Sequence, residues 1–282
     1  MEDIMGKKNQ SNRLTIQQKA NEGVIGIFGQ EAKEHDFEVS EVSHLVKEQL
    51  EKEYPQLQFR YRKTIKKKEI NEVLKEIDKD LGQTLFVEKS EIKPDGGIIE
   101  VQDDNQKWRV VLVSEAKHQG KDIENIRKGK LVGKKKDKDL MVAGNAIERA
   151  YKNISEIANL MLSESYFPYV IFLEGSNFIT QNISVERPDG RVVVLDYKKG
   201  SLNRLDRLTA ANYGMKINSN VCRNKLITNN DASIMLQATS IYTQGDGKKW
   251  KREEMFSTMM DIAKTSLQML GRDLFKQLTT KS

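Results

Sequence analysis

The chain has 282 residues, of which 38% are hydrophobic and 31% are charged, and its 47 Lys and Arg residues outnumber its 41 Asp and Glu residues. This length suits one large α/β domain, and the basic excess favours a polyanionic partner such as nucleic acid. The single cysteine, Cys222, excludes an intramolecular disulfide, and because the sequence shows no signal peptide and no apolar run of membrane length, we expect a cytoplasmic protein.

The first part of the chain predicts a polar arm followed by two helices. Residues 1–17 are polar, which indicates a flexible N-terminal arm. Ser40 has the character of a helix N-cap, and apolar residues then recur at helical spacing until Pro55 closes the segment. Residues 66–81 carry a second apolar stripe at the same spacing. Both stripes predict helices that face the core and have no chemical role.

The middle of the chain predicts a hairpin of two strands. Residues 97–101 have an extended pattern, residues 103–106 have turn composition, and residues 108–114 are strongly apolar. A strand that is mostly apolar on both faces is typical of the buried part of a sheet. We therefore expect residues 108–114 to lie in the interior.

The second half of the chain alternates helices and strands. Residues 146–162 form a helical pattern whose inward positions are Ile147, Tyr151, Ile154, Ala158 and Met161. Strands are expected at residues 168–173 and 191–195, and helices at residues 203–211 and over much of residues 251–278. This alternation, without a repeat or a linker, predicts a single α/β domain over residues 1–282, in which helices flank a mixed central β-sheet.

Two short motifs, Pro94-Asp95 and Glu115-Ala116-Lys117, match the PD-(D/E)xK nuclease pattern. If residues 97–101 and 108–114 form a hairpin centred on its turn, Asp95 lies directly opposite Glu115, with Cβ atoms about 5 Å apart. Glu115 and Lys117 then share one face of the strand, while Ala116 points away and leaves its carbonyl oxygen as a further ligand.

This set has the chemistry that phosphodiester hydrolysis needs. A hard divalent cation stabilises charge on the scissile phosphate and acidifies a bound water, and Lys117 can orient or deprotonate that water or stabilise the developing charge. The three histidines are scattered and no Cys/His zinc spacing exists, so oxygen ligands for magnesium or manganese are indicated. On spacing alone, an ordinary turn at Asp95 and a strand end at Glu115 explain the same residues equally well.

A second match to the pattern, Pro188-Asp189 with Asp196-Tyr197-Lys198, fails on geometry. The residues between Asp189 and Asp196 have the pattern of one uninterrupted strand, which at ~3.3 Å per residue separates the two carboxylates by ~23 Å. They could not bind one metal ion, and residues 188–190 are predicted to form a turn.

Six longer blocks resemble the EcoRI-type family of type II restriction endonucleases, and the resemblance covers nearly the whole chain. The blocks are residues 23–29, 92–97, 115–121, 144–149, 152–159 and 203–214. The resemblance implies a restriction-endonuclease-like fold and a homodimer that embraces double-stranded DNA. It implies Mg²⁺-dependent cleavage of GAATTC after the G on each strand, leaving 5′-phosphate overhangs, with Mn²⁺ as a substitute metal. It also implies a cognate DNA methyltransferase.

The resemblance further assigns roles to single residues. The implied catalytic residues are Asp95, Glu115 and Lys117, and the implied metal ligands are Asp95, Glu115 and the backbone carbonyl of Ala116. The implied base-edge residues are Asn145, Ala146 and Arg149, and the implied recognition and subunit-coupling residues are Glu148, Arg204 and Arg207. Lys93 and Lys121 match positions near the scissile phosphate and the catalytic loop.

The chemistry of the recognition block is compatible with these roles. Asn can pair with adenine through two hydrogen bonds, and Arg can pair with guanine in the same way, in the major groove. Taken from the residues alone, however, a helix cap is the favoured interpretation of Asn145, and an ion pair with Glu148 or Asp206 is the favoured interpretation of Arg149.

Three classes of function stay open at this point: a site-specific restriction nuclease, a structure-specific repair or recombination nuclease, and a DNA-binding regulator that does not cleave. The set of Asp95, Glu115 and Lys117 argues against the regulator, because a pure binder has no need of clustered carboxylates near phosphate. Val142 stands where the family has alanine, and Ser201 stands where it has isoleucine. Both lie in base-reading segments, so the nuclease activity is indicated more firmly than the target.

Overall fold

The computed structural model describes residues 30–83, 89–132, 144–196 and 216–274. At its centre lies a five-stranded sheet with the order β1-β4-β5-β6-β11. These strands are β1 (Phe59–Arg62), β4 (Gly97–Gln102), β5 (Trp108–His118), β6 (Tyr169–Glu174) and β11 (Ser240–Thr243). β4 pairs antiparallel with both β1 and β5, whereas β6 pairs parallel with both β5 and β11. The predicted mixed sheet is confirmed.

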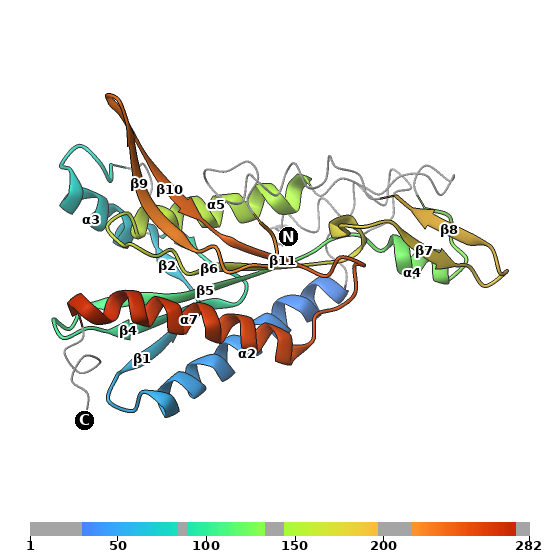
Figure 1. Ribbon diagram of the computed structural model, residues 1–282, viewed down its shortest axis with the longest axis horizontal. Coiled ribbons are helices and arrows are strands. Elements are labelled where there is room, and N and C mark those ends of the chain that lie inside the picture. Colours follow the sequence, from blue (N-terminus) through green and yellow to red (C-terminus); the bar gives the residue numbers. More distant parts are fainter. Residues whose placement is uncertain (1–29, 84–88, 133–143, 197–215, 275–282) are drawn as a thin grey trace, which may run out of the picture.

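Four long helices of the described chain cover the two faces of this sheet (Figure 1). One face carries α2 (Gln30–Glu53) and α7 (Arg252–Leu274), and the other carries α3 (Lys67–Ile77) and α5 (Gly144–Leu160). β6 is buried throughout and serves both layers, because Phe172 packs with the α2 and α7 cluster and Ile171 with the α3 and α5 cluster. The predicted α/β class, with helices flanking the sheet, is therefore confirmed.

Smaller elements extend from this framework. They are β2 (Ile65–Lys66), β3 (Glu91–Ile92), α4 (Asp122–Arg127), the 3₁₀ turn η1 (Ser176–Phe178), β7 (Ile183–Glu186), β8 (Val192–Leu195), β9 (Arg223–Asn229) and β10 (Ala232–Ala238). The β9–β10 hairpin projects at one end of the molecule, and α4 with the β7–β8 hairpin lies at the other (Figure 1). No helix in the described ranges is both long and apolar enough to cross a membrane.

The helix expected to begin at Ser40 begins earlier, so that prediction was wrong. α2 starts at Gln30, and its buried face already includes His35 and Val39. Ser40 does not cap the helix, because it lies in its interior with its hydroxyl 3.2 Å from the Tyr61 hydroxyl. The helix does end before Pro55, as predicted.

The other helices keep their predicted places with shorter ends or altered faces. α3 ends at Ile77, which is exposed, rather than at residue 81. In α5 the predicted inward positions are buried except Tyr151, which is 45% exposed, so its inward placement was wrong. The reason is helical rotation, because the neighbouring Ala150 takes the buried position.

The remaining predictions have mixed outcomes. Residues 188–190 form the predicted turn, with Gly190 N donating to Arg187 O at 3.0 Å between β7 and β8. β5 is buried from Val110 to Ala116, whereas Trp108 and Arg109 are only partly buried, and the strand runs on to His118. The helix expected at residues 203–211 and the arm expected at residues 1–17 lie outside the described residues.

Candidate active site

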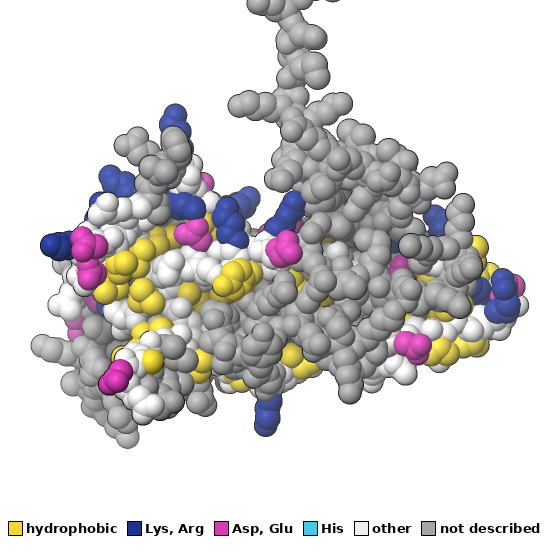
Figure 2. Space-filling view, turned by 90° about the horizontal axis from the view of Figure 1, so that it is seen from above, with side chains coloured by type: hydrophobic (Ala, Val, Ile, Leu, Met, Phe, Trp, Pro, Cys, Tyr) yellow, Lys and Arg dark blue, Asp and Glu magenta, His cyan; other side chains and the backbone are white. Residues whose placement is uncertain are grey.

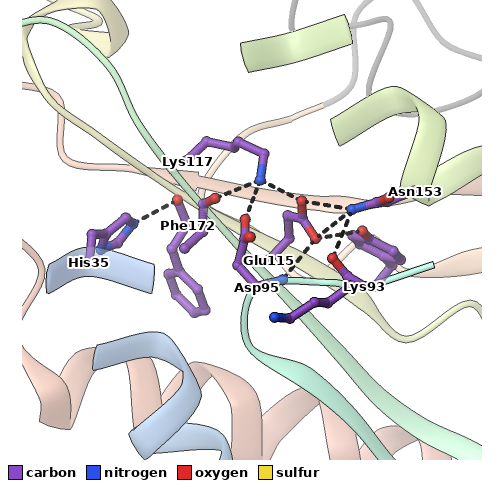
Figure 3. Close-up of polar contacts among 9 residues, drawn as sticks. His35, Lys93, Asp95, Glu115, Lys117, Asn153 and Phe172 are labelled. Carbon is purple, nitrogen blue, oxygen red and sulfur yellow. Dashed lines mark hydrogen bonds and ion pairs between the residues drawn. The ribbon is translucent and has the colours of Figure 1, made fainter. Parts of the chain in front are cut away.

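Asp95, Glu115 and Lys117 lie together on the α5 side of the central sheet (Figure 3). Lys117 Nζ contacts Asp95 Oδ2, and it lies 2.5 Å from Glu115 Oε1 and 2.8 Å from the Ala116 carbonyl oxygen. The side chain of Ala116 packs on the opposite side, with the α2 and α7 cluster. The alternation along β5 thus places Glu115 and Lys117 on one face, as their spacing predicted.

A β-bulge changes the predicted route by which Asp95 reaches this face. The β4–β5 register shifts by one residue midway along the hairpin, so that Gly97 pairs with Ser114. Asp95 is therefore not directly opposite Glu115, and the expected pairing was wrong by one residue. The turn before β4 compensates, because Gly96 N donates to Ser114 O at 2.9 Å and Asp95 N donates to Glu115 Oε2 at 3.3 Å. The two carboxylates still meet.

The Glu115 carboxylate is fully buried and is held by donors from several elements. The Tyr169 hydroxyl donates to Glu115 Oε2 at 3.1 Å, and Asn153 Nδ2 lies 3.2 and 3.4 Å from the two carboxylate oxygens. Burial raises the pKa of Glu115 to about 7, although the Lys117 ammonium favours the ionised form. This carboxylate is consequently fixed in position before any ligand arrives.

Lys117 occupies the point at which three oxygens converge. Burial alone would lower the pKa of Lys117, but the carboxylates of Glu115 and Asp95 outweigh burial and raise the pKa above its usual value. The ammonium therefore stays charged beside Asp95, Glu115 and the Ala116 carbonyl. Oxygen donors of this kind fit a hard divalent cation. Among the described residues, no group of three or more His, Cys, Asp or Glu side chains is arranged to hold a metal ion. Water or phosphate oxygens would therefore have to complete the coordination of a cation here.

A third carboxylate, Asp36 on α2, belongs to the same region and was missed from the sequence. Burial and the charge of Asp95 raise the pKa of Asp36 to about 7, while Lys117 acts in the opposite direction. In the sequence Asp36 looks like part of a solvated, charged helix face. Only the packing of α2 against β5 reveals that its charge interacts with the site.

A buried polar cluster adjoins the site at the ends of β5 and β6. The Glu174 carboxylate lies 3.1 Å from His118 Nδ1 and 3.1 Å from His35 Nδ1, and it accepts from Trp250 N at 3.3 Å. His35 Nε2 lies 3.0 Å from the Phe172 carbonyl oxygen (Figure 3). Burial opposes ionisation of Glu174, but its hydrogen bond with His118 and the charge of His35 lower its pKa. Two histidines that are scattered in the sequence thus meet in the fold.

The described residues that the sequence proposed to contact DNA come from several elements. Lys93 is exposed two residues before Asp95, and Lys121 precedes α4 and pairs with Glu31 of α2. Glu148 and Arg149 are exposed on α5. For Asn145 and Ala146 the backbone at the start of α5 is described but the side chains are not. The residues that lie wholly outside the described ranges are Val142, Ser201, Arg204 and Arg207.

The visible charge on the face that α5 occupies is mixed. Figure 2 shows Lys and Arg side chains close to Asp and Glu side chains there, rather than one continuous basic surface. The distribution of charge therefore does not locate a nucleic-acid surface among the described residues. The position of Asp95, Glu115 and Lys117 indicates more directly where DNA would bind.

Comparison with known proteins identifies the family. Residues 21–277 match the family model described as restriction endonuclease EcoRI. The chain is 70% identical over 277 residues to the type II restriction enzyme EcoRI of Escherichia coli, covering 98% of this chain and 100% of that protein. It is 48% identical over 267 residues to the type II restriction enzyme RsrI of Cereibacter sphaeroides, covering 95% of this chain and 96% of that protein. Enzymes of this family generally depend on a divalent metal and act on double-stranded DNA. The chain belongs to the EcoRI restriction endonuclease family and is a type II site-specific deoxyribonuclease.

Proposed function

We propose that this enzyme cleaves GAATTC after the G on each strand and leaves 5′-phosphate overhangs, with Asp95, Glu115 and Lys117 as catalytic residues. The observation that carries the catalytic assignment is the convergence of two carboxylates and the Ala116 carbonyl beside one ammonium. The target is supported by the 70% identity to EcoRI over nearly the whole chain. Mg²⁺ is the proposed metal, and Mn²⁺ is expected to substitute because both accept hard oxygen ligands.

The proposed metal ligands are Asp95, Glu115 and the Ala116 carbonyl oxygen. When bound, Mg²⁺ would neutralise charge on the scissile phosphate and acidify a water molecule. Lys117 can donate hydrogen bonds from its ammonium to that water or to a phosphate oxygen, which orients the attack and stabilises the developing charge. The water oxygen bonds to phosphorus as the bond from phosphorus to the 3′ oxygen breaks. The water gives up a proton and the 3′ oxygen takes one up, so the phosphate stays on the 5′ end.

Base reading is proposed to begin at the start of α5. Asn145, Ala146 and Arg149 would meet base edges, and Glu148 would support them, because a helix fits the major groove with its first turns forward. Arg204 and Arg207 are proposed to extend this recognition and to couple the subunits. Lys93 and Lys121 are proposed to contact phosphates near the cleaved bond.

The assembly and its cellular setting are proposed in the same way. A palindromic target calls for a two-fold symmetric homodimer, in which each protomer reads one half-site. We also propose a single endonuclease domain over residues 1–282, with residues 1–17 as a flexible N-terminal arm. The family match over residues 21–277 supports the single domain. We propose that the enzyme is cytoplasmic. Because unrestrained cleavage would damage host DNA, we also propose that it is paired with a cognate methyltransferase.

Digestion of plasmid and random-library DNA in Mg²⁺, followed by sequencing of the ends, tests this function. Ends after the G of GAATTC on both strands are the expected result. A different consensus would overturn the proposed target, and nicks confined to branched DNA would indicate a repair nuclease. Arg149→Lys tests the reading residue, because lysine lacks the planar fork that makes two aligned hydrogen bonds. We expect it to lose ~1–3 kcal/mol of base discrimination per half-site.

A further inference from the structure

We propose that Asn153 is a positioning residue that links the recognition helix α5 to the metal-binding carboxylate of Glu115. This inference rests on the proposed roles of Glu115 and of the start of α5, and it assigns a function to a residue that the motif does not contain. Asn153 would make the arrangement of the catalytic carboxylate depend on how α5 lies on the bases.

The first support is the set of contacts that Asn153 makes. Its Nδ2 donor lies 3.2 Å from Glu115 Oε1, 3.4 Å from Glu115 Oε2 and 3.4 Å from the Lys93 carbonyl oxygen (Figure 3). One amide group therefore contacts both the loop before Asp95 and the catalytic part of β5. A helix surface residue has no structural need for such a bridge, since the apolar face of α5 already fastens the helix to the sheet.

The second support is the position of Asn153 on the helix. Asn153 follows the proposed base reader Arg149 by four residues, so the two side chains share one face, one turn of about 5.4 Å apart. Ile154, on the neighbouring face, is fully buried against the sheet. A shift or rotation of α5 on the bases would therefore move the Asn153 amide relative to Glu115, which is held on β5.

The third support is that Tyr169 also donates a hydrogen bond to Glu115 but does not lie on the recognition helix α5. Tyr169 lies on β6, its side chain is fully buried, and its hydroxyl donates to Glu115 Oε2 at 3.1 Å. The carboxylate is thus positioned from two sides, by the rigid sheet through Tyr169 and by the recognition helix through Asn153. Only the second contact can report on base recognition.

The test compares Asn153→Ala with Tyr169→Phe, because each removes one side-chain donor from Glu115. For each variant, single-turnover cleavage is measured on the wild-type enzyme's best site and on a site with one base pair changed. Equilibrium binding of both sites is measured by gel shift without metal. Cleavage discrimination is the ratio of the cleavage rates on the two sites, and binding discrimination is the ratio of their affinities. The quantity compared between variants is the discrimination excess, which is cleavage discrimination divided by binding discrimination. Asn159→Ala, an exposed Asn-to-Ala change on the same helix, is the matched control.

We expect both variants to cleave more slowly and to need more Mg²⁺, but only Asn153→Ala to reduce the discrimination excess, by at least about fivefold. Metal-free binding should stay near the wild-type value in all three variants. An excess that is unchanged in Asn153→Ala, or reduced equally in Tyr169→Phe, would overturn the coupling role and leave only support of Glu115. A wild-type enzyme without any excess would overturn it as well. A wild-type enzyme that cuts no duplex DNA would instead overturn the proposed function.

Discussion

Glu115 shows how much of the chemistry depends on single side chains. Its buried carboxylate is surrounded by the Lys117 ammonium, the Tyr169 hydroxyl and the Asn153 amide, all of which donate to it. Sequence spacing predicted Glu115 and Lys117, because alternation along a strand is a local property. It could not predict Tyr169 or Asn153, because their contacts with Glu115 depend on how β6 and α5 pack onto β5.

Glu115→Gln is expected to slow cleavage severely while DNA binding persists. Gln keeps the size of the side chain but removes the negative charge that a divalent cation requires. We expect the single-turnover rate to fall on the order of a hundredfold or more. The same preparation should still shift its target in a metal-free gel assay. Cleavage near the wild-type rate would remove Glu115 from the mechanism.

Asp122 gives a prediction for stability against pH. It is 8% exposed, and burial together with the charge of Glu124 raises its pKa to about 6. Because this value lies above that of an unfolded Asp, about 3.9, the folded state holds the proton more tightly. Folding stability therefore falls as the pH rises through the window between the two values.

Asp122→Asn should remove that loss. We expect a gain on the order of 1 kcal/mol at pH 8 and little change at pH 4, measured by urea unfolding at both pH values. Asp189→Asn is a suitable control, since Arg191 holds the pKa of exposed Asp189 below its usual value and no gain at pH 8 is expected. An equal effect of Asp122→Asn at both pH values would show that its charge is not the cause.

At the scale of elements, the β4–β5 hairpin decides where the catalytic residues meet. The position of its turn was predictable, because Asp103 to Gln106 have turn composition, and the pairs beside the turn keep the predicted register. The bulge between Ile99 and Glu100 was not predictable, because its residues are apolar or ordinary strand residues. Bulges of this kind re-aim side chains near functional sites, and here the bulge moves Asp95 by one position.

Gly96 in the turn before β4 is expected to be essential to this geometry. A Cβ atom on Gly96 would lie 2.6 Å from Val39 Cγ1 and would also clash with the Ser114 hydroxyl. Gly96→Ala should cost about 1–3 kcal/mol of folding stability and should slow cleavage, because the turn carries Asp95.

Gly190→Ala is the control that separates a loss of folding stability from a loss of cleavage. Gly190 has a positive φ of 81°, but a Cβ atom there meets no other atom within 4 Å. It should lose stability through backbone strain alone, by about 1 kcal/mol, and should cleave normally. Thermal unfolding and single-turnover cleavage of both variants are the measurements. Normal cleavage by Gly96→Ala would show that the position of Asp95 tolerates a displaced turn.

At the scale of the whole molecule, the alternation of helices and strands predicted the α/β class but not the strand order. β1 was not predicted, because Phe59 to Arg62 reads Phe-Arg-Tyr-Arg and belongs to a basic run. β11 joins β6 only through a pairing between distant parts of the chain, such as Ile241 with Ile171. Periodicity describes one element at a time, whereas strand order depends on which buried faces fit together. The site was easier to predict, since two of its three residues lie on one strand.

The proposed homodimer places one catalytic site at each DNA strand. If each protomer reads one half-site, each also supplies one Glu115 to one DNA strand, so cutting both strands needs two intact sites. A mixed dimer of wild-type and Glu115→Gln protomers, purified through two different affinity tags, should convert supercoiled plasmid to the nicked circle and stop there. The wild-type dimer should continue to the linear form, and the Glu115→Gln homodimer should leave the plasmid intact. Linear product from the mixed dimer at the wild-type rate would mean that one protomer cuts both strands. The proposal that each protomer of the symmetric dimer cuts one strand would then be wrong.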